Sequence, residues 1–321
     1  MHFRFRPAVR GLASRSLCGI SPWATVALLL LCGGPAGASQ DPAQHHLYTY
    51  RGEAARAGLG SALLTLPDLD GDQFREFAVA APGAFTNLRG RVEVCSGRTG
   101  RPLLTIDGEA GADGLGDRFG SALALLPDLD GDGRPELAIG APLDDDGGSQ
   151  SGAISVHSLA DGSLLARLSS PGLETRSGEV LLSPGDLNQD GVPDLVAASA
   201  FASQVRAWSG AWIAAIAAGQ TPVGAPVLWS HAGASGSDLG RALARLGDLD
   251  QDGVADLAVG APFDGPADGP AGRLWLLSGR TGSVLGSLAG AAAGERFAEC
   301  LSNPGDVDGD GLPELGLSAP G

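Results

Sequence analysis

The chain of 321 residues contains no lysine, and only 5% of its residues are aromatic. Its 21 basic residues are therefore all arginines, against 37 Asp and Glu, and the formal net charge is −16. Nucleic acids and anionic membranes bind proteins through clustered Lys and Arg, so this balance argues against both as partners. With so few aromatic side chains, a folded core has to consist mainly of Leu, Val and Ala.

Long apolar runs are missing as well, apart from one at residues 23–31 that is too short to be a convincing transmembrane helix. Four arginines and no acid precede or surround this stretch within residues 1–38, and the small residues Ala36-Gly37-Ala38 end it. This order predicts a signal peptide, whose removal would bring the formal charge from −16 to −20. We therefore expect a secreted or cell-surface protein without membrane insertion. A lipoprotein anchor at Cys32 is less favoured, because Leu31 stands where a small residue is expected.

Catalytic signatures are also absent. The sequence has no GxSxG motif and no Walker loop, and beyond the adjacent pair His45-His46 its histidines show no metal-binding spacing. We therefore expect no enzymatic activity. Outside the predicted signal peptide two cysteines remain, Cys95 and Cys300. An exported protein can form a disulfide, but these two positions are not equivalent in the repeats described next, which favours two buried free thiols.

A short acidic loop is present five times. The loops begin at Asp68, Asp128, Asp186, Asp248 and Asp306, at intervals of 58 to 62 residues. A near-constant period of this length is typical of repeat architectures. Acidic or amide side chains stand at positions 1, 3, 5 and 9 of each loop, and position 7 offers a backbone carbonyl. The predicted metal ligands are Asp68, Asp70, Asp72, Phe74 and Glu76; Asp128, Asp130, Asp132, Arg134 and Glu136; Asp186, Asn188, Asp190, Val192 and Asp194; Asp248, Asp250, Asp252, Val254 and Asp256; and Asp306, Asp308, Asp310, Leu312 and Glu314.

Alternating acids place oxygen atoms on one concave side of a tight turn, which a Gly at position 6 allows to close. Oxygen ligands in this number suit calcium better than zinc, so we expect Ca²⁺ in about one site per loop, up to five. Gln73 replaces the Gly and Asn188 removes a charge, so the first site should be the weakest and the third weakened. An EF-hand is excluded because position 12 is apolar in every loop.

Phe119-Gly120 before the second loop and Gly140-Ala141-Pro142 after it complete a longer pattern. GAP recurs at 260–262, and related triplets stand at 80–82 and 318–320, whereas FG is degenerate in the other repeats. The pattern resembles the FG-GAP repeats of integrin α subunits over about residues 47–321. The resemblance implies a β-propeller of four-stranded blades, in which structural cations brace the loops on the face away from the ligand.

The expected fold class is all-β, a propeller with five repeats and an incomplete last blade. In the first repeat, residues 59–66, 77–81, 91–95 and 103–106 are predicted strands, and residues 273–277 copy the third of them. The predicted domains are a signal peptide at 1–38, a linker at 39–46 and the propeller at 47–321. The repeats are expected at about 47–107, 108–168, 169–230, 231–288 and 289–321. Integrin propellers have seven blades, which favours a fragment; residues 47–51 could pair with the last blade.

The third repeat carries an insertion at residues 211–226. It is predicted as an extended hairpin or a short helix with Trp212 and Ile213 exposed, either a partner contact or a tolerated surface insertion. Asp144-Asp145-Asp146 also departs from the repeat pattern. It could be an extra cation or ligand contact, but a solvated loop is favoured.

The function expected from this pattern is a secreted calcium-binding module for binding or adhesion. Its partner would be an extracellular protein or carbohydrate. The contact would be made by residues 83–89, 144–152 and 263–272, opposite the acidic loops. The alternative is an accessory domain of a larger extracellular enzyme, and a structural surface component without a specific ligand is the third possibility.

Overall fold

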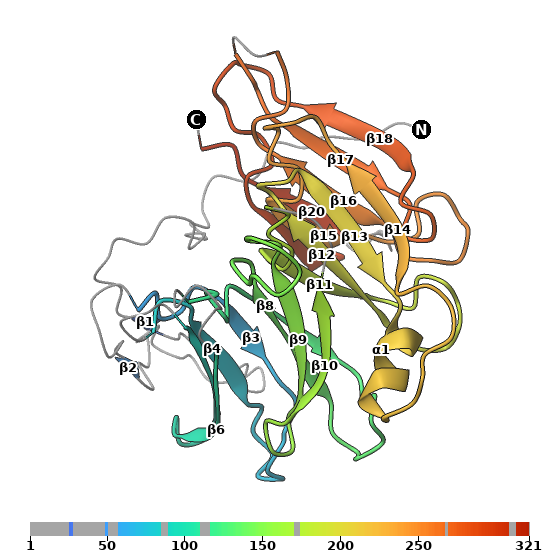
Figure 1. The fold of residues 1–321 in the computed structure, drawn as a ribbon. Coiled ribbons are helices and arrows are strands. Elements are labelled where there is room, and N and C mark those ends of the chain that lie inside the picture. Colours follow the sequence, from blue (N-terminus) through green and yellow to red (C-terminus); the bar gives the residue numbers. More distant parts are fainter. Residues whose placement is uncertain are drawn as a thin grey trace, which may run out of the picture.

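The computed structural model describes residues 26–27, 49–50, 57–84, 89–109, 116–169, 174–266, 269–307 and 313–320. Within these ranges the chain forms four sheets of four antiparallel strands, and in each sheet the strands neighbour one another in chain order. Two further strands make a fifth, two-stranded sheet, and a separate two-residue pairing joins β1 to β2. Figure 1 shows the sheets following one another along the chain.

The first sheet consists of β3 (Leu63–Thr65), β4 (Phe77–Ala81), β5 (Arg91–Cys95) and β6 (Pro102–Asp107). The second consists of β7 (Ala122–Leu126), β8 (Glu136–Ala141), β9 (Ala153–Ser158) and β10 (Leu164–Ser169). The third has β11 (Val180–Gly185), β12 (Asp194–Ser199), β13 (Gln204–Trp208) and β14 (Val227–Ala232). The fourth has β15 (Ala242–Arg245), β16 (Leu257–Ala261), β17 (Arg273–Leu277) and β18 (Val284–Ala289). The remaining strands are β1 (Val26–Ala27), β2 (Thr49–Tyr50), β19 (Leu301–Gly305) and β20 (Glu314–Leu317).

The first strands of successive sheets contact one another. β3 contacts β7, β7 contacts β11, β11 contacts β15, and β15 contacts β19. The four larger apolar clusters then lie between neighbouring sheets instead of in one common centre: Leu137 packs with Val92 and Ile106 of the first sheet, and Leu257 packs with Val205 of the third. Sheets that meet along their first strands and bury their faces against each other are blades of a propeller. The all-β, blade-type prediction is confirmed, including the two-stranded last sheet.

The second strand of each complete sheet is buried along its whole length, which explains its small residues. At Gly140 a Cβ atom would lie 2.0 Å from the carbonyl oxygen of Gly178 in the next repeat. At Gly260 it would lie 2.1 Å from the carbonyl oxygen of Ala298. Gly140 also forms a hydrogen bond inside its own repeat: its carbonyl oxygen accepts the Gly120 N–H at 3.0 Å. The FG and GAP motifs therefore mark one junction, where adjacent repeats are held backbone to backbone.

The insertion in the third repeat takes one of its two predicted forms, a short helix, but without the predicted exposure. It forms the helix α1 (Gly210–Ala217), whose N-cap Ser209 accepts a hydrogen bond from the backbone N–H of Trp212. Ile213 is fully buried and Trp212 is half-buried against the cluster between the second and third sheets. The predicted exposure of both side chains is wrong, because the helix contacts β10 and β12 and buries its apolar side there.

Both cysteines that we expected to remain are free: Cys95 is buried, and Cys300 is only half-buried. The predicted pairing of residues 47–51 with the last blade is not observed, since β2 pairs with β1. Most of the predicted signal peptide lies outside the described residues. Among the residues that are described, no helix is long and apolar enough to cross a membrane.

Candidate metal-binding loops

The acidic loops join the first and second strands of their sheets, as predicted. Each loop is shaped by its own carboxylates: Asp128, at position 1 of the second loop, accepts hydrogen bonds from the N–H groups of Gly131 at 2.7 Å and Gly133 at 2.8 Å. Position 5 carboxylates accept the N–H of position 7, as Asp132 does from Arg134 at 2.7 Å. Position 6 has positive φ in the first four loops, and Gln73 adopts φ 72° where the second loop has Gly133 at 86°.

Neighbouring loops lie on the same face of the molecule. The side-chain amide of Gln189 in the third loop lies 3.5 Å from the carbonyl oxygen of Gly253 in the fourth. In turn, Gly247 beside the fourth loop lies against Pro313 of the fifth. Because antiparallel strands alternate in direction, the connections between second and third strands lie at the other end of each sheet.

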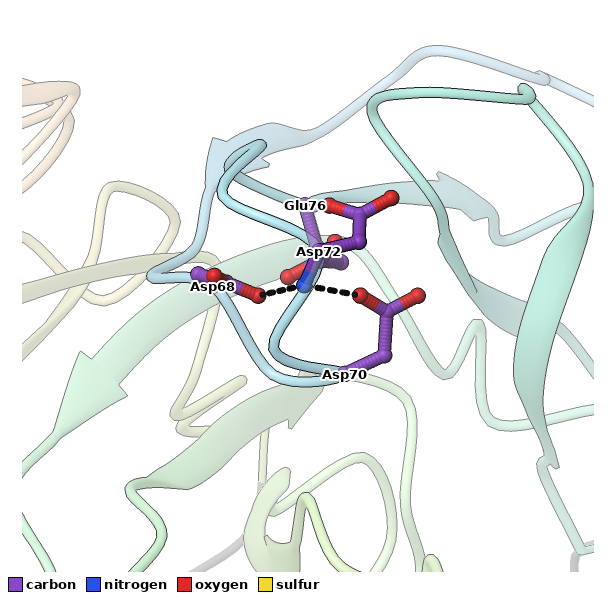
Figure 2. Close-up of side chains that lie close together, drawn as sticks. All are labelled: Asp68, Asp70, Asp72 and Glu76. Atoms are coloured by element: carbon purple, nitrogen blue, oxygen red, sulfur yellow. Dashed lines mark hydrogen bonds between the residues drawn. The ribbon is translucent and has the colours of Figure 1, made fainter.

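Carboxylates converge in three of the loops. One oxygen from each of Asp68, Asp70, Asp72 and Glu76 lies within 4.8 Å of the others, and the four acids of the second loop are equally close. In the fourth loop Asp248, Asp250 and Asp256 form such a group without Asp252. Figure 2 shows how the first loop achieves this: Asp68 and Asp70 both accept a hydrogen bond from the backbone nitrogen of Asp72, while Glu76 faces them from the start of β4.

Among the predicted side-chain ligands of the first four loops, only the carboxylate at position 9 is buried. One of its oxygens always accepts the backbone N–H of position 2, at 2.8 Å from Leu129 to Glu136 and 2.6 Å from Leu249 to Asp256. The second oxygen differs between loops. Asp256 uses it to accept the N–H of Gly279 at 3.0 Å, and Asp194 likewise accepts from Gly210 at 2.7 Å.

The longer glutamates leave this second oxygen without a partner. Oε1 of Glu76 and Oε1 of Glu136 are buried and make no hydrogen bond within the described structure. Burial raises the pKa of Glu136 to about 7, against the lowering effect of the Leu129 N–H, and the nearby loop aspartates raise it further. Burial also raises the pKa of Glu76, Asp194 and Asp256, with backbone N–H groups opposing it in each case.

Two loops have internal partners that compete for their ligand atoms. In the third loop the side-chain amide of Asn188 donates to Asp190 at 2.8 Å. In the fourth, the Arg280 guanidinium binds the Asp252 carboxylate at 3.0 Å and the Asp252 carbonyl at 2.8 Å. Of the fifth loop, Asp306 and Glu314 are described, and Glu314 accepts the N–H of Val307. Its other predicted ligands, Asp308, Asp310 and Leu312, lie outside the described residues.

The predicted carbonyl ligands at position 7 belong to Phe74, Arg134, Val192 and Val254, and each of these residues donates its N–H to the position 5 side chain of its own loop. Sequence analysis missed two features. It did not find Arg280 as a partner of Asp252, although Arg98 and Arg280 occupy equivalent places in the turns at 96–100 and 278–282. It also treated Asp and Glu at position 9 as equivalent.

The residues fit a hard divalent cation. The predicted ligand atoms are all oxygens. Zinc prefers nitrogen and sulfur ligands, so these loops suit a hard cation better than zinc. Buried carboxylate oxygens without a hydrogen-bond partner are unfavourable unless a proton or a cation accompanies them. The first and second loops each have such an oxygen within a group of four acids.

Comparison with known proteins finds a matching repeat family and similar proteins. Residues 119–157 and 239–277 match the profile of the FG-GAP repeat. Human integrin alpha-7 is 38% identical over 140 residues, which cover 42% of this chain and 11% of the relative. Integrin alpha-PS2 of Drosophila melanogaster is 27% identical over 274 residues, covering 81% of this chain and 15% of the relative. The chain thus contains FG-GAP repeats and is similar to integrin alpha chains over part of their length.

The chain spans only a small part of the length of these relatives. Neither they nor the repeat profile indicate a catalytic family. Among solved structures, a computationally designed protein matches at 18% identity with a TM-score of 0.42, covering 75% of this chain and 55% of that one.

Proposed function

We propose that the chain is a secreted or cell-surface binding module whose propeller is braced by calcium in the acidic loops. The similarity to integrin alpha chains supports a non-enzymatic, extracellular role. The formal charge of −16 supports divalent cations as necessary partners, because uncompensated carboxylate clusters repel one another. The proposed organisation remains a signal peptide at 1–38, a linker at 39–46 and the propeller at 47–321.

Calcium would be held in the second loop by Asp128, Asp130, Asp132, the Arg134 carbonyl and Glu136, and in the first loop by the equivalent Asp68, Asp70, Asp72, Phe74 and Glu76. The third, fourth and fifth loops would use the same positions, with ligand atoms of the third and fourth partly engaged by Asn188 and Arg280. When bound, the ion supplies positive charge that offsets the clustered carboxylates. The protein's own contribution is to hold position 1 and position 5 side chains on backbone N–H groups, so that one oxygen of each lies close to those of the other loop acids.

The observation that carries the proposal is the buried, unpartnered Oε1 of Glu136 within a group of four acids. A carboxylate in that position needs a proton or a cation, and three neighbouring aspartates favour the cation. No reacting group stands beside the loops among the described residues, so the ion's role would be structural. Metal bound by the folded state alone also stabilises that state by mass action.

Calorimetric titration of calcium into chelator-treated protein tests this proposal. We expect saturable binding that Asp130→Ala combined with Asp132→Ala reduces, with a lower calcium-dependent melting temperature. Asp161→Ala is the matched control, since Asp161 is an exposed acid in the β9–β10 turn of the same repeat. Absence of calcium binding in the millimolar range would contradict the proposal.

A ligand would be bound at the other end of the sheets, by the connections between second and third strands. These include residues 144–152 and the described parts of 83–89 and 263–272. Phe263, 39% exposed, lies there under the Arg296 guanidinium at 5.3 Å. Substitutions in these segments should reduce ligand binding and leave calcium-dependent stability unchanged. If they lowered calcium-dependent stability instead, the division between a bracing face and a ligand face would be wrong.

A further inference from the structure

A small cavity lies at the joint between the first and second sheets, away from the acidic loops. It has a volume of about 70 Å³ and is lined by residues of β6, β9 and β10 and by the segment before β7. Its polar lining includes Asp107, Asp117, Asp144, His157 and Arg167, and its apolar lining includes Phe119 and Leu164.

His157 on β9 presents an unpartnered nitrogen at this cavity. Its side chain is only 8% exposed and stacks edge-on against Phe119 with ring centroids 5.8 Å apart. Nδ1 lies 3.0 Å from the carbonyl oxygen of Gly162, which can only accept, so Nδ1 carries the ring hydrogen. Burial lowers the pKa of His157, which keeps the ring neutral. Nε2 is therefore a buried acceptor, and it has no hydrogen-bond partner in the described structure.

Asp117 is a second buried acceptor in the lining. It is 6% exposed, and no residue in the described part of the chain donates a hydrogen bond to its carboxylate or forms an ion pair with it. Burial, reinforced by the nearby Asp144 carboxylate, raises the pKa of Asp117 to about 7. The one guanidinium in the lining is partly engaged: Arg167 binds Asp144 and also Asp146 at 2.8 Å through one terminal nitrogen, while its Nε has no hydrogen-bond partner among the described residues. The prediction that residues 144–146 form a solvated loop is wrong for Asp144, which is 1% exposed.

These two acceptors indicate which kind of chemical group the cavity could bind. A group that satisfies both must donate at least two hydrogen bonds, and a positive charge would offset the Asp117 carboxylate. Hard cations such as Ca²⁺ take oxygen ligands and would leave the imidazole unsatisfied. A transition metal needs more protein ligands, and among the described residues neither His157 nor Asp117 belongs to a group of three converging metal-ligating side chains.

We propose that this cavity binds the primary ammonium group of an external ligand, with N–H donated to His157 Nε2 and to the Asp117 carboxylate. The alkyl carbons next to the ammonium would contact Phe119 and Leu164. The chain contains no lysine, so apart from its own N-terminus it has no primary amine, and a side-chain ammonium would come from outside, either as a free alkylamine or as a lysine side chain of another protein. The negative net charge of the protein favours the approach of such a cation.

Calorimetric titration of the calcium-saturated protein with n-butylammonium tests the proposal. We expect millimolar binding, no binding of the uncharged 1-butanol, and a loss on the order of tenfold or more in Asp117→Asn. Asp161→Asn is the matched control and should bind as the native protein does. The comparison of butylammonium with butanol uses the native protein, so it remains decisive if Asp117→Asn folds poorly.

Two peptide arms distinguish the sources of the ammonium. A blocked Gly-Lys-Gly peptide that binds at least as tightly as butylammonium, while its Nε-acetylated form does not, indicates a lysine side chain of a protein. Binding of butylammonium without binding of the peptide indicates a free amine. Failure of butylammonium to bind, binding equal to that of butanol, or unchanged binding in Asp117→Asn would overturn the proposal. Calcium binding at the loops is measured separately and is not affected by any of these outcomes.

Discussion

The second and fourth acidic loops carry the same three leading aspartates, yet they use the carboxylate at position 9 differently. Glu136 reaches the Leu129 N–H with one oxygen and leaves the other buried without a partner. Asp256 is one methylene shorter, and both of its oxygens accept backbone N–H groups, from Leu249 and Gly279. The second loop thus keeps an oxygen available for an ion, whereas the fourth uses its carboxylate to tie the loop to the turn after β17.

The position 5 aspartates differ in the same sense. Both accept the N–H of position 7, but the further partner of Asp132 is the Ser158 hydroxyl at 3.3 Å, while Asp252 is bound by the Arg280 guanidinium. One repeated motif has therefore become two kinds of loop, one open to an external cation and one partly satisfied by the protein. The difference teaches that a matching sequence motif does not fix the strength of a site, because the partners of each ligand atom come from other strands.

Removal of calcium should have the largest effect, because it leaves the second loop with an uncompensated cluster while the fourth keeps its internal partners. A site held at 100 times its dissociation constant contributes about 2.7 kcal/mol. We therefore expect chelation to lower Tm by about 5 °C or more. Differential scanning calorimetry with and without EGTA measures this shift. Equal melting temperatures in the two conditions would show that neither loop depends on calcium.

The substitution Glu136→Gln should remove the oxygen that distinguishes the second loop from the fourth. The amide oxygen can still accept the Leu129 N–H, but the unpartnered oxygen is replaced by an uncharged NH₂ group. We expect the calcium affinity of the second loop to fall on the order of tenfold, because ligand charge sets affinity at such sites. Calcium titration of the variant against the native protein provides the measurement.

Asp256→Asn is the matched variant in the fourth loop. One of its two N–H donors would then face an NH₂ group, and an unsatisfied buried donor costs about 1–3 kcal/mol. The expected loss of stability is therefore present with chelator as well as with calcium, whereas Glu136→Gln should lower stability only when calcium is bound. If both variants changed calcium affinity equally and stability equally, the two loops would not differ in the way described.

A smaller effect is expected where the first loop departs from the second. Gln73 is held at φ 72°, in the left-handed region that only Gly adopts without strain. Gln73→Gly should stabilise the protein by about 0.5–1 kcal/mol, reduced by the greater freedom of Gly in the unfolded chain. Urea unfolding measures it. The reverse change Gly133→Gln should destabilise by a similar amount, and stabilisation by that change would refute the argument.

The smallest effect should come from Arg280→Gln, which releases Asp252 in the fourth loop. The pair is partly exposed, so its contribution is about 0.2–1 kcal/mol. We expect the calcium affinity of that loop to rise about threefold, which would make it more similar to that of the second loop. Arg134→Gln is the control, because Arg134 is an exposed arginine in the second loop. A fall in affinity for Arg280→Gln would mean that the guanidinium supports the site instead of competing for it.

Much of the fold could be predicted because it depends on local pattern. The strands at Phe77–Ala81, Arg91–Cys95 and Arg273–Leu277 match their predicted bounds. The alternation of buried and exposed side chains and the turn residues around them suffice to define such strands. The helix α1 was less certain, and its burial was missed, because the surface that covers Ile213 is built by β10 and β12 of two different sheets.

By itself, the sequence determined the repeat period, the four-stranded unit and the oxygen-rich loop between its first two strands, since spacing and residue type depend on the chain alone. Only the tertiary structure decided which loop carboxylates stay unpartnered, that Asp144 is buried with Arg167, and that His157 and Asp117 share a cavity. Each of these depends on which groups from other strands lie within hydrogen-bond distance. The packing of the sheets determines those distances, because it decides which groups from other strands lie next to a given side chain.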